Sequence, residues 1–234
     1  MSTIPCLATG YARLKGEALN GEGFRGLVGR WAPINQGPGG VFLYDSSGHP
    51  QGVGGLTAIS VADWESSQFG TVVNFPAAGS HIVVASRADL EPLELTVRVL
   101  FRTGAALGGY LMLKGIVAGN VDYAVQLVVG GSINAFFNDG AARNHGTPAG
   151  IVVINHWYDL CFSIGNGRCR IWVDQSLRFD AAEANPMPQS GGALNLGMAA
   201  AGGSFLGKLA LCEIWNYCLP KPPDPDPHFL AYAD

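Results

Sequence analysis

The sequence has 234 residues, which is enough for one large β domain or for two small ones. Its 14 Lys and Arg residues and 18 Asp and Glu residues give a formal net charge of -4 at pH 7. This balance excludes a protein held to nucleic acid or to anionic lipid by bulk charge, because both need clustered Lys and Arg. Hydrophobic residues make up 48% of the chain and charged residues 14%, so we expect a sizeable core beneath a weakly charged surface.

The first 25 residues predict an extended arm. They contain four glycines and few large apolar side chains, a composition suited to pairing with another chain. They also lack a basic segment followed by a long apolar run, so we expect no secretory signal. No stretch of the sequence approaches the roughly 18 apolar residues of a membrane-spanning helix.

From residue 26 onward, short β-rich segments alternate with turns that contain Gly, Asn or Asp. In segment 93–101, apolar residues at every second position predict a half-buried strand, and a helical turn is expected only within 59–70. Asn166 and Gly167 tolerate positive φ and predict a hairpin turn. The predicted strands are 40–45, 81–85, 93–101, 123–129, 133–139, 151–155, 157–164, 169–174, 193–197 and 208–219. This series predicts an all-β fold, an antiparallel sandwich or barrel.

The last 15 residues differ from the rest of the chain. Five prolines within 220–227 fix the backbone and remove hydrogen-bond donors, which predicts an extended, polyproline-like tail. The tail ends in an apolar group, Phe229, Leu230 and Tyr232, that we expect to insert into a neighbouring protein. The predicted organisation is therefore an arm (1–25), a β domain (26–219) and a tail (220–234).

The cysteines leave two possibilities open. Without a secretory signal, we expect reduced thiols. The short separations of Cys161 from Cys169 and of Cys212 from Cys218 still allow two disulfides.

Several motifs follow one another in an order typical of one superfamily. They are GLVGRW, LYDSSGHPQGVGGLT, FGTVVNF, LELTVRVLFR, HWYDLCFSIGNGRCRIWVD and ALNLG followed by KLALCEIWNYCL. Over roughly 26–219 the chain resembles the concanavalin A-like, laminin-G-like jelly-roll superfamily, which implies a two-sheet antiparallel sandwich. It departs from the family at two turns, 75–77 and 173–175, where the usual glycine is missing. The first 75 residues also resemble laminin-G-like proteins of tailed bacteriophages.

Catalytic and metal sites are not expected. Asp89, Glu91 and Glu94 have the spacing of a glycosidase pair of carboxylates, but Pro92 interrupts the strand that would present them. No nucleophile motif is present, and the histidines are isolated, so we predict no enzyme and no cofactor. The resemblance makes Asp45 and Glu213 candidate calcium ligands, while the simpler interpretation is that a turn Asp binds local backbone N–H groups.

A sugar-binding site needs exposed aromatic rings beside polar side chains, because sugar rings stack on π faces and their hydroxyls need polar partners. The residues of predicted loops that meet this requirement are Trp64, Phe137, Asn138, Asp139, Asn144 and His145.

Two functional hypotheses remain. The first is a non-catalytic structural protein of a bacteriophage virion, a capsid decoration or a tail or fibre module. Such a protein would be made in the host cytoplasm and act as a homo-oligomer with other virion proteins. The alternative is a lectin-like carbohydrate-binding module, with host-surface glycans as partners.

Overall fold

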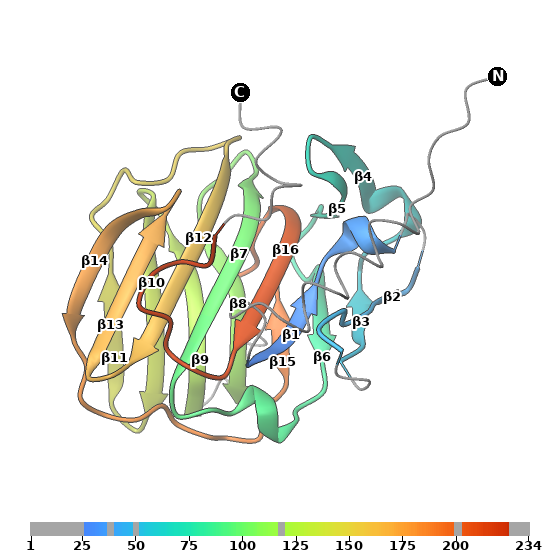
Figure 1. The fold of residues 1–234 in the computed structure, drawn as a ribbon. Coiled ribbons are helices and arrows are strands. Elements are labelled where there is room, and N and C mark those ends of the chain that lie inside the picture. Colours follow the sequence, from blue (N-terminus) through green and yellow to red (C-terminus); the bar gives the residue numbers. More distant parts are fainter. Residues whose placement is uncertain (1–25, 37–39, 49–51, 117–119, 199–202, 225–234) are drawn as a thin grey trace.

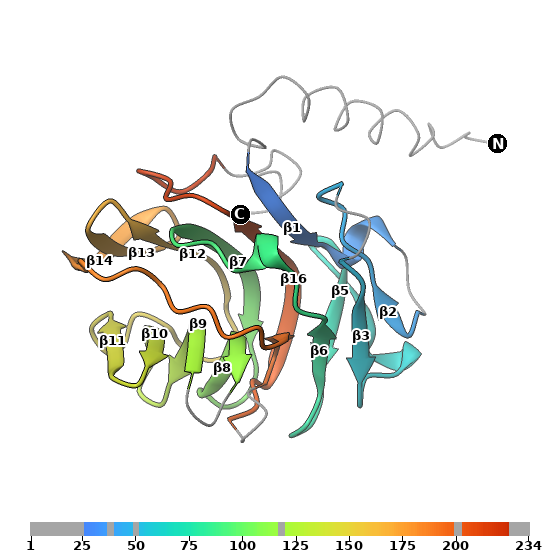
Figure 2. The same cartoon turned by 90° about the horizontal axis from the view of Figure 1, so that it is seen from below.

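The computed structural model describes residues 26–36, 40–48, 52–116, 120–198 and 203–224. These residues form two stacked antiparallel sheets, which confirms the predicted all-β, two-sheet sandwich of the jelly-roll kind (Figures 1 and 2). Figure 2 looks along the sandwich, with β14, β13, β12 and β7 in one layer and β11, β10, β9 and β8 in the other.

Sheet A has the order β14-β13-β12-β7-β16-β5-β4, with β1 paired to β16. Its strands are β1 (Leu27–Trp31), β4 (Trp64–Ser67), β5 (Gly70–Phe75), β7 (Leu95–Thr103), β12 (Trp157–Gly165), β13 (Arg168–Val173), β14 (Ser176–Ala182) and β16 (Gly207–Trp215).

Sheet B has the order β11-β10-β9-β8-β15-β6-β3-β2. Its strands are β2 (Phe42–Leu43), β3 (Gly54–Thr57), β6 (His81–Val84), β8 (Gly109–Ile116), β9 (Asn120–Val128), β10 (Ser132–Asp139), β11 (Ala142–Gly146) and β15 (Leu194–Leu196). The described residues also include the single-turn 3-10 helices η2 (Pro33–Asn35), η3 (Val61–Asp63) and η4 (Ala88–Leu90), and η3 lies where the sequence predicts a helical turn.

The core lies between the sheets and combines many aliphatic side chains with a smaller set of buried aromatic rings. Phe205, which precedes β16, contacts Phe75 and Phe101 with both ring centroids 5.9 Å away and with edge-on geometry. These three rings are almost fully buried. Edge-on contacts of this kind add to the stability gained from burying apolar area.

β7 differs from its prediction as a half-buried strand. The residues on its outer face, Thr96 and Arg98, are only 0% and 3% exposed. Thr96 is covered because the chain after β16 crosses the outer face of sheet A (Figure 1). There the Thr96 hydroxyl donates to the carbonyl of Tyr217 at 3.0 Å and accepts from the N–H of Leu219 at 2.8 Å.

The predicted strand at 151–155 is wrong, because these residues form bends and a turn. Val152 packs into the core, while Asn155 adopts a positive φ of 60°. The strands β3, β4, β8, β11 and β14 were not expected from the sequence, and they complete the sheets.

The tail begins against the domain, with Pro222 buried. The predicted arm (1–25) and the apolar group Phe229, Leu230 and Tyr232 lie outside the described residues, so their roles stay predictions.

Four cysteines are free thiols in the described part of the chain. Cys161 lies opposite Arg98 and Trp172 on the outer face of sheet A, whereas Cys169 belongs to the core between the sheets. Because the two side chains point to opposite faces of the sheet, they cannot form a disulfide.

Candidate functional site

A row of side chains crosses the outer face of sheet B. Tyr110 of β8 lies opposite Gln126 of β9, Gln126 lies opposite Asn134 of β10, and Asn134 lies opposite Gly146 of β11. Successive residues of a strand point to opposite faces, and the neighbouring Ala135 belongs to the core, so this row points outward. The three side chains are partly exposed.

A second row lies beside the first. Phe136 of β10 is opposite Ala124 on one side and Asn144 of β11 on the other. The rings of Phe136 and Tyr110 are partly buried and pack on a small apolar cluster that includes Ala124 and Leu113. Packing fixes the rings while leaving part of each accessible. We call the two rows the sheet B platform; its members are Tyr110, Gln126, Asn134, Phe136 and Asn144.

The side-chain amides of the platform are available to bind a ligand. Within the part of the chain that the structure describes, the amides of Gln126, Asn134 and Asn144 have no hydrogen-bond partner. An amide group offers two donors and one acceptor oxygen, so it matches the hydroxyl groups of a polyol. The platform therefore combines fixed rings with free amides on one sheet face.

Gly146 leaves room for one of these amides. A Cβ atom at this position would lie 2.3 Å from Oδ1 of Asn134, closer than real Cβ atoms come. The backbone of Gly146 does not have a positive φ, so the glycine is needed for space and not for an unusual conformation.

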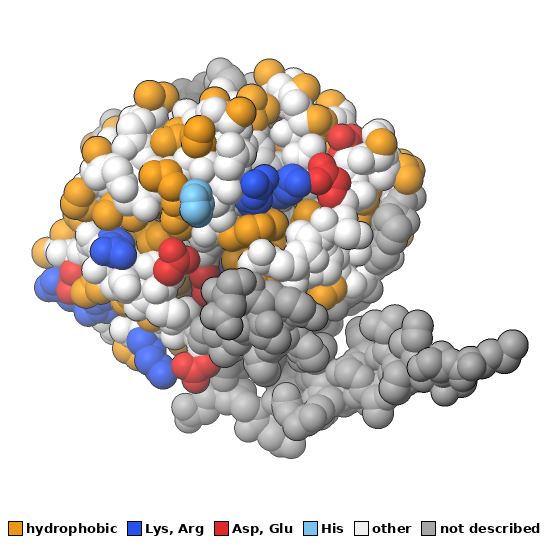
Figure 3. All heavy atoms as spheres, turned by 90° about the horizontal axis from the view of Figure 1, so that it is seen from above, with side chains coloured by type: hydrophobic (Ala, Val, Ile, Leu, Met, Phe, Trp, Pro, Cys, Tyr) orange, Lys and Arg blue, Asp and Glu red, His pale blue; other side chains and the backbone are white. Residues whose placement is uncertain are grey.

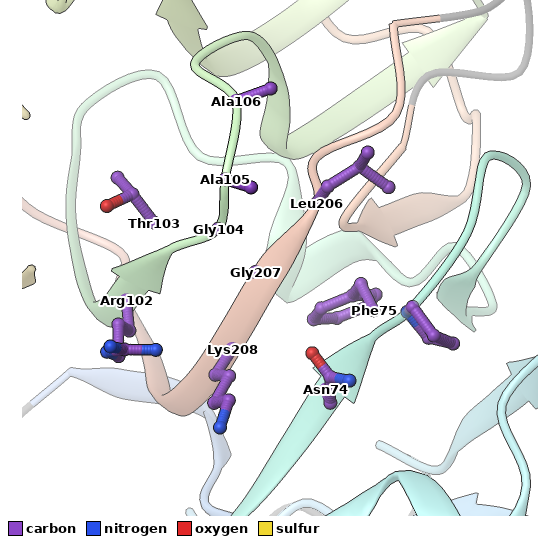
Figure 4. Close-up of a pocket in the computed structure, with 11 residues that line it drawn as sticks. Asn74, Phe75, Arg102, Thr103, Gly104, Ala105, Ala106, Leu206, Gly207 and Lys208 are labelled. Atoms are coloured by element: carbon purple, nitrogen blue, oxygen red, sulfur yellow. The ribbon is translucent and has the colours of Figure 1, made fainter. Parts of the chain in front are cut away.

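Another polar row crosses the outer face of sheet A near its end. Trp157 of β12 lies opposite Arg102 of β7, Arg102 lies opposite Lys208 of β16, and Lys208 lies opposite Asn74 of β5. The last three line an open pocket of about 320 Å³ (Figure 4). We call it the basic pocket. Figure 3 views this end of the sandwich, where charged side chains form small groups among hydrophobic and uncharged ones.

The cations of the basic pocket differ in their partners. The ammonium group of Lys208 is paired with the carboxylate of Glu65. Neither Arg102 nor Asn74 has a side-chain hydrogen bond or an ion pair among the described residues. A partly exposed guanidinium group is therefore left without a counter-ion beside a second cation.

Five of the six residues predicted to bind sugar lie on the paired strands β10 and β11, but the six do not form one exposed surface. Trp64 is 7% exposed and Phe137 is 0% exposed, and both belong to the core between the sheets. Their buried rings offer no face for stacking, which corrects the expectation from the sequence. Asn138 is partly exposed, and its side-chain oxygen accepts the N–H of Gly140 at 3.0 Å. The side chain of Asp139 lies outside the described residues.

Asn144 and His145 are neighbours on β11, but their side chains lie in different environments. Asn144 is exposed and belongs to the platform, whereas His145 points toward the core side at the edge of the sandwich. Nε2 of His145 lies 2.8 Å from Oε2 of Glu183, and Nη1 of Arg143 donates to Oε1 of Glu183 at 3.0 Å. We call these three residues the Glu183 latch, because Glu183 follows β14 of sheet A and its partners lie on β11 of sheet B.

The electrostatics of the latch favour an ionised Glu183. Burial raises the pKa of this carboxyl, but hydrogen bonds from His145, from the backbone N–H of Asn185 and from Arg143 outweigh it and lower the pKa below its usual value.

The carboxylates with glycosidase-like spacing are bound to different partners. Asp89 accepts from Nε of Arg87 at 2.7 Å, and Glu91 accepts from Nζ of Lys114 at 2.7 Å. Glu94 accepts the backbone N–H of Asn166 at 2.9 Å. Because each group has its own partner, the three do not form a facing acid–base pair.

The carboxylates of the candidate calcium ligands bind arginine side chains and backbone N–H groups. Oδ1 of Asp45 accepts the N–H groups of Arg30 and Ser47, both at 2.8 Å, and Arg87 lies 3.0 Å from Oδ2. Glu213 lies 3.3 Å from Nε of Arg30. Among the described residues, no three His, Cys, Asp or Glu side chains form a group that could hold a metal ion.

No protein-family model and no curated protein matches the sequence. Solved structures do match the fold. Domain 4 of AbnA, a GH43 extracellular arabinanase from Geobacillus stearothermophilus in complex with arabinotriose, has a TM-score of 0.64 and 15% identity. The match covers 82% of this chain and 93% of that domain.

Two further structures are similar over part of their length. A mutant of Trypanosoma rangeli sialidase displaying trans-sialidase activity has a TM-score of 0.63 and 12% identity, covering 91% of this chain and 37% of the sialidase. The binding domain of botulinum neurotoxin DC in complex with SialylT has a TM-score of 0.58 and 11% identity, covering 88% of this chain and 51% of the toxin chain. At such identities, the likeness shows a shared β-sandwich fold.

The described part of the chain contains no helix with the length and apolar character needed to span a bilayer. The similar structures named above do not bear on the virion role, which stays a prediction from the sequence.

Proposed function

We propose that this protein is a non-catalytic carbohydrate-binding domain that holds a glycan on the sheet B platform. The observation that carries the proposal is the pairing of two fixed aromatic rings, Tyr110 and Phe136, with three amides on one sheet face that have no hydrogen-bond partner among the described residues. A sugar presents an apolar face of C–H groups, which packs on such rings, and a rim of hydroxyls, which the amides can bind.

The similar solved structures support the same class of ligand. Domain 4 of AbnA was solved with arabinotriose, and the neurotoxin binding domain was solved with SialylT. These ligands belong to those proteins, and the fold hosts several unrelated functions. The platform of this chain therefore carries the argument, and the comparisons only favour the class.

The contacts of the carboxylates with glycosidase-like spacing support the non-catalytic part of the proposal. Glu91 accepts a hydrogen bond from Lys114, and Glu94 accepts one from the backbone N–H of Asn166. Neither carboxylate therefore faces a partner carboxylate across a substrate-sized gap. Platform binding also needs no metal ion, since the amides supply donors and acceptors themselves.

A glycan array followed by isothermal titration calorimetry tests the proposal. The array should reveal at least one oligosaccharide, and Phe136→Ala should weaken its binding roughly 10-fold, as loss of a central aromatic contact costs more than about 1 kcal/mol. Phe42→Ala is the matched control, because Phe42 is 45% exposed and lies on β2 at the far edge of the same sheet. Absence of binding on the array, or equal losses in the two variants, contradicts the proposal.

A further inference from the structure

The basic pocket contains a charge arrangement that the fold alone does not explain. Arg102 and Lys208 are directly opposite each other on neighbouring strands and point to the same face (Figure 4). Like charges in this position repel one another and destabilise a sheet. Glu65 compensates Lys208 but leaves Arg102 without a partner among the described residues. The pocket thus has one positive charge more than it has negative charges.

We propose that the basic pocket binds the carboxylate group of an acidic sugar residue. A guanidinium group presents parallel N–H donors that match the two oxygens of a carboxylate, and the ammonium group of Lys208 adds a second positive charge beside it. A single excess charge matches a monoanion such as a carboxylate better than a doubly charged phosphate. This site is on sheet A, on the other layer from the platform, and it does not depend on the platform binding a glycan.

The surroundings of Arg102 favour a sugar over a free carboxylate ion. The pocket volume of about 320 Å³ is at the lower end of the range for small-molecule sites, and a carboxylate alone would fill little of it. The free amide of Asn74 lies on one side of the two cations, where it can bind a ring hydroxyl. Trp157 lies opposite Arg102 on the other side, and its partly exposed ring is held edge-on against Phe69 at 4.8 Å.

The walls of the pocket are suited to a sugar that enters from solvent. Gly104, Ala105 and Ala106 contribute small side chains or none, and Ala105 and Ala106 are exposed. A Cβ atom at Gly104 would lie 2.5 Å from the carbonyl oxygen of Leu206, so a larger residue does not fit there. The net charge of -4 means that binding depends on these local contacts and not on long-range attraction.

The test compares acidic and neutral forms of the same saccharide by titration calorimetry. The probes are trigalacturonic acid with its methyl ester, 3′-sialyllactose with lactose, and sodium acetate alone. At least one acid should bind 10-fold or more tightly than its neutral partner and than acetate. Arg102→Gln should remove that preference, and Arg102→Lys should restore it only in part, because an ammonium group lacks the paired donors.

The control is Arg178→Gln, which removes an exposed arginine from β14 at the far edge of the same sheet. It should leave binding within twofold of the unchanged protein, and all variants should keep the thermal unfolding midpoint within a few degrees. Phe136→Ala on the platform should leave the acid preference intact, which separates this site from the proposed function. Equal binding of acid and neutral forms, acetate binding as tightly as the saccharide, no binding of either acid, or an unchanged preference in Arg102→Gln overturns the proposal.

Discussion

Arg98 and Asp159 form a two-pronged ion pair between β7 and β12. Nε of Arg98 lies 2.8 Å from Oδ1 of Asp159, and Nη2 lies 2.9 Å from Oδ2. The arginine is only 3% exposed although it lies on the outer face of its sheet. Such a charge is tolerated in a buried position because its Nε and Nη2 each donate to one oxygen of the same carboxylate.

We expect Asp159→Ala to destabilise the protein by roughly 3 kcal/mol, since it removes the close partner of a buried charge and leaves Arg98 only the more distant carboxylate of Glu213, 3.8 Å from its Nη1. Urea unfolding followed by tryptophan fluorescence measures the change. Asp224→Ala is the control, because the Asp224 side chain is 89% exposed and its contact with Lys221 is a surface pair worth at most about 1 kcal/mol. Similar losses in both variants would show that the pair does not anchor the sheet.

The positions of many strands were predictable from the sequence, but the environment of each face was not. The alternation in 93–101 correctly placed Leu95, Val97 and Val99 toward the core. It could not show that the segment after β16 would cover Thr96, because that contact joins residues 121 positions apart. β8 escaped prediction because Lys114 breaks its apolar pattern, and only the structure shows Glu91 and Asp122 beside that ammonium group.

The sugar-binding prediction chose the buried ring of a neighbouring pair. In the predicted strand 133–139, Ile133, Ala135 and Phe137 share one face, and Asn134 and Phe136 share the other. Treating Phe137 as a loop residue ignored this alternation, which assigns the ring beside asparagine to the outer face. The same rule would have found Phe136. The basic pocket lacked such a signal, because its residues come from strands that are paired only in the folded chain.

The Glu183 latch predicts loss of stability in acid. A carboxyl whose pKa is lower in the folded than in the unfolded state stabilises the fold above its unfolded pKa, and this contribution is lost as the pH falls through the folded pKa. We therefore expect the free energy of unfolding to fall below about pH 4.5, and to fall less steeply in Glu183→Gln. Urea unfolding between pH 3 and 7 measures both curves. Parallel curves would exclude Glu183 as a source of the pH dependence.

Gly146→Ala tests the platform without removing any of its groups. The added Cβ meets Oδ1 of Asn134 and forces that amide to rotate, so we expect several-fold weaker binding of the glycan found on the array. The backbone conformation suits alanine, and the thermal unfolding midpoint should move by only a few degrees. Gly55→Ala is the control, because its Cβ would meet nothing nearer than the Val83 carbonyl oxygen at 3.9 Å. If the two alanine variants bind equally well, Asn134 does not contact the ligand.

The buried thiols should be unreactive until the protein unfolds. Burial raises the pKa of Cys161 and Cys212 far above the usual range and that of Cys169 to about 12, so almost no reactive thiolate is present at neutral pH. In a Cys6→Ser variant, which removes the one cysteine outside the described residues, we expect little reaction with a thiol reagent in buffer. The same variant should show four reactive thiols in urea. Mass spectrometry before and after reduction supplies the control. A mass gain on reduction, or rapid labelling of the folded protein, would contradict the assignment of reduced and buried cysteines.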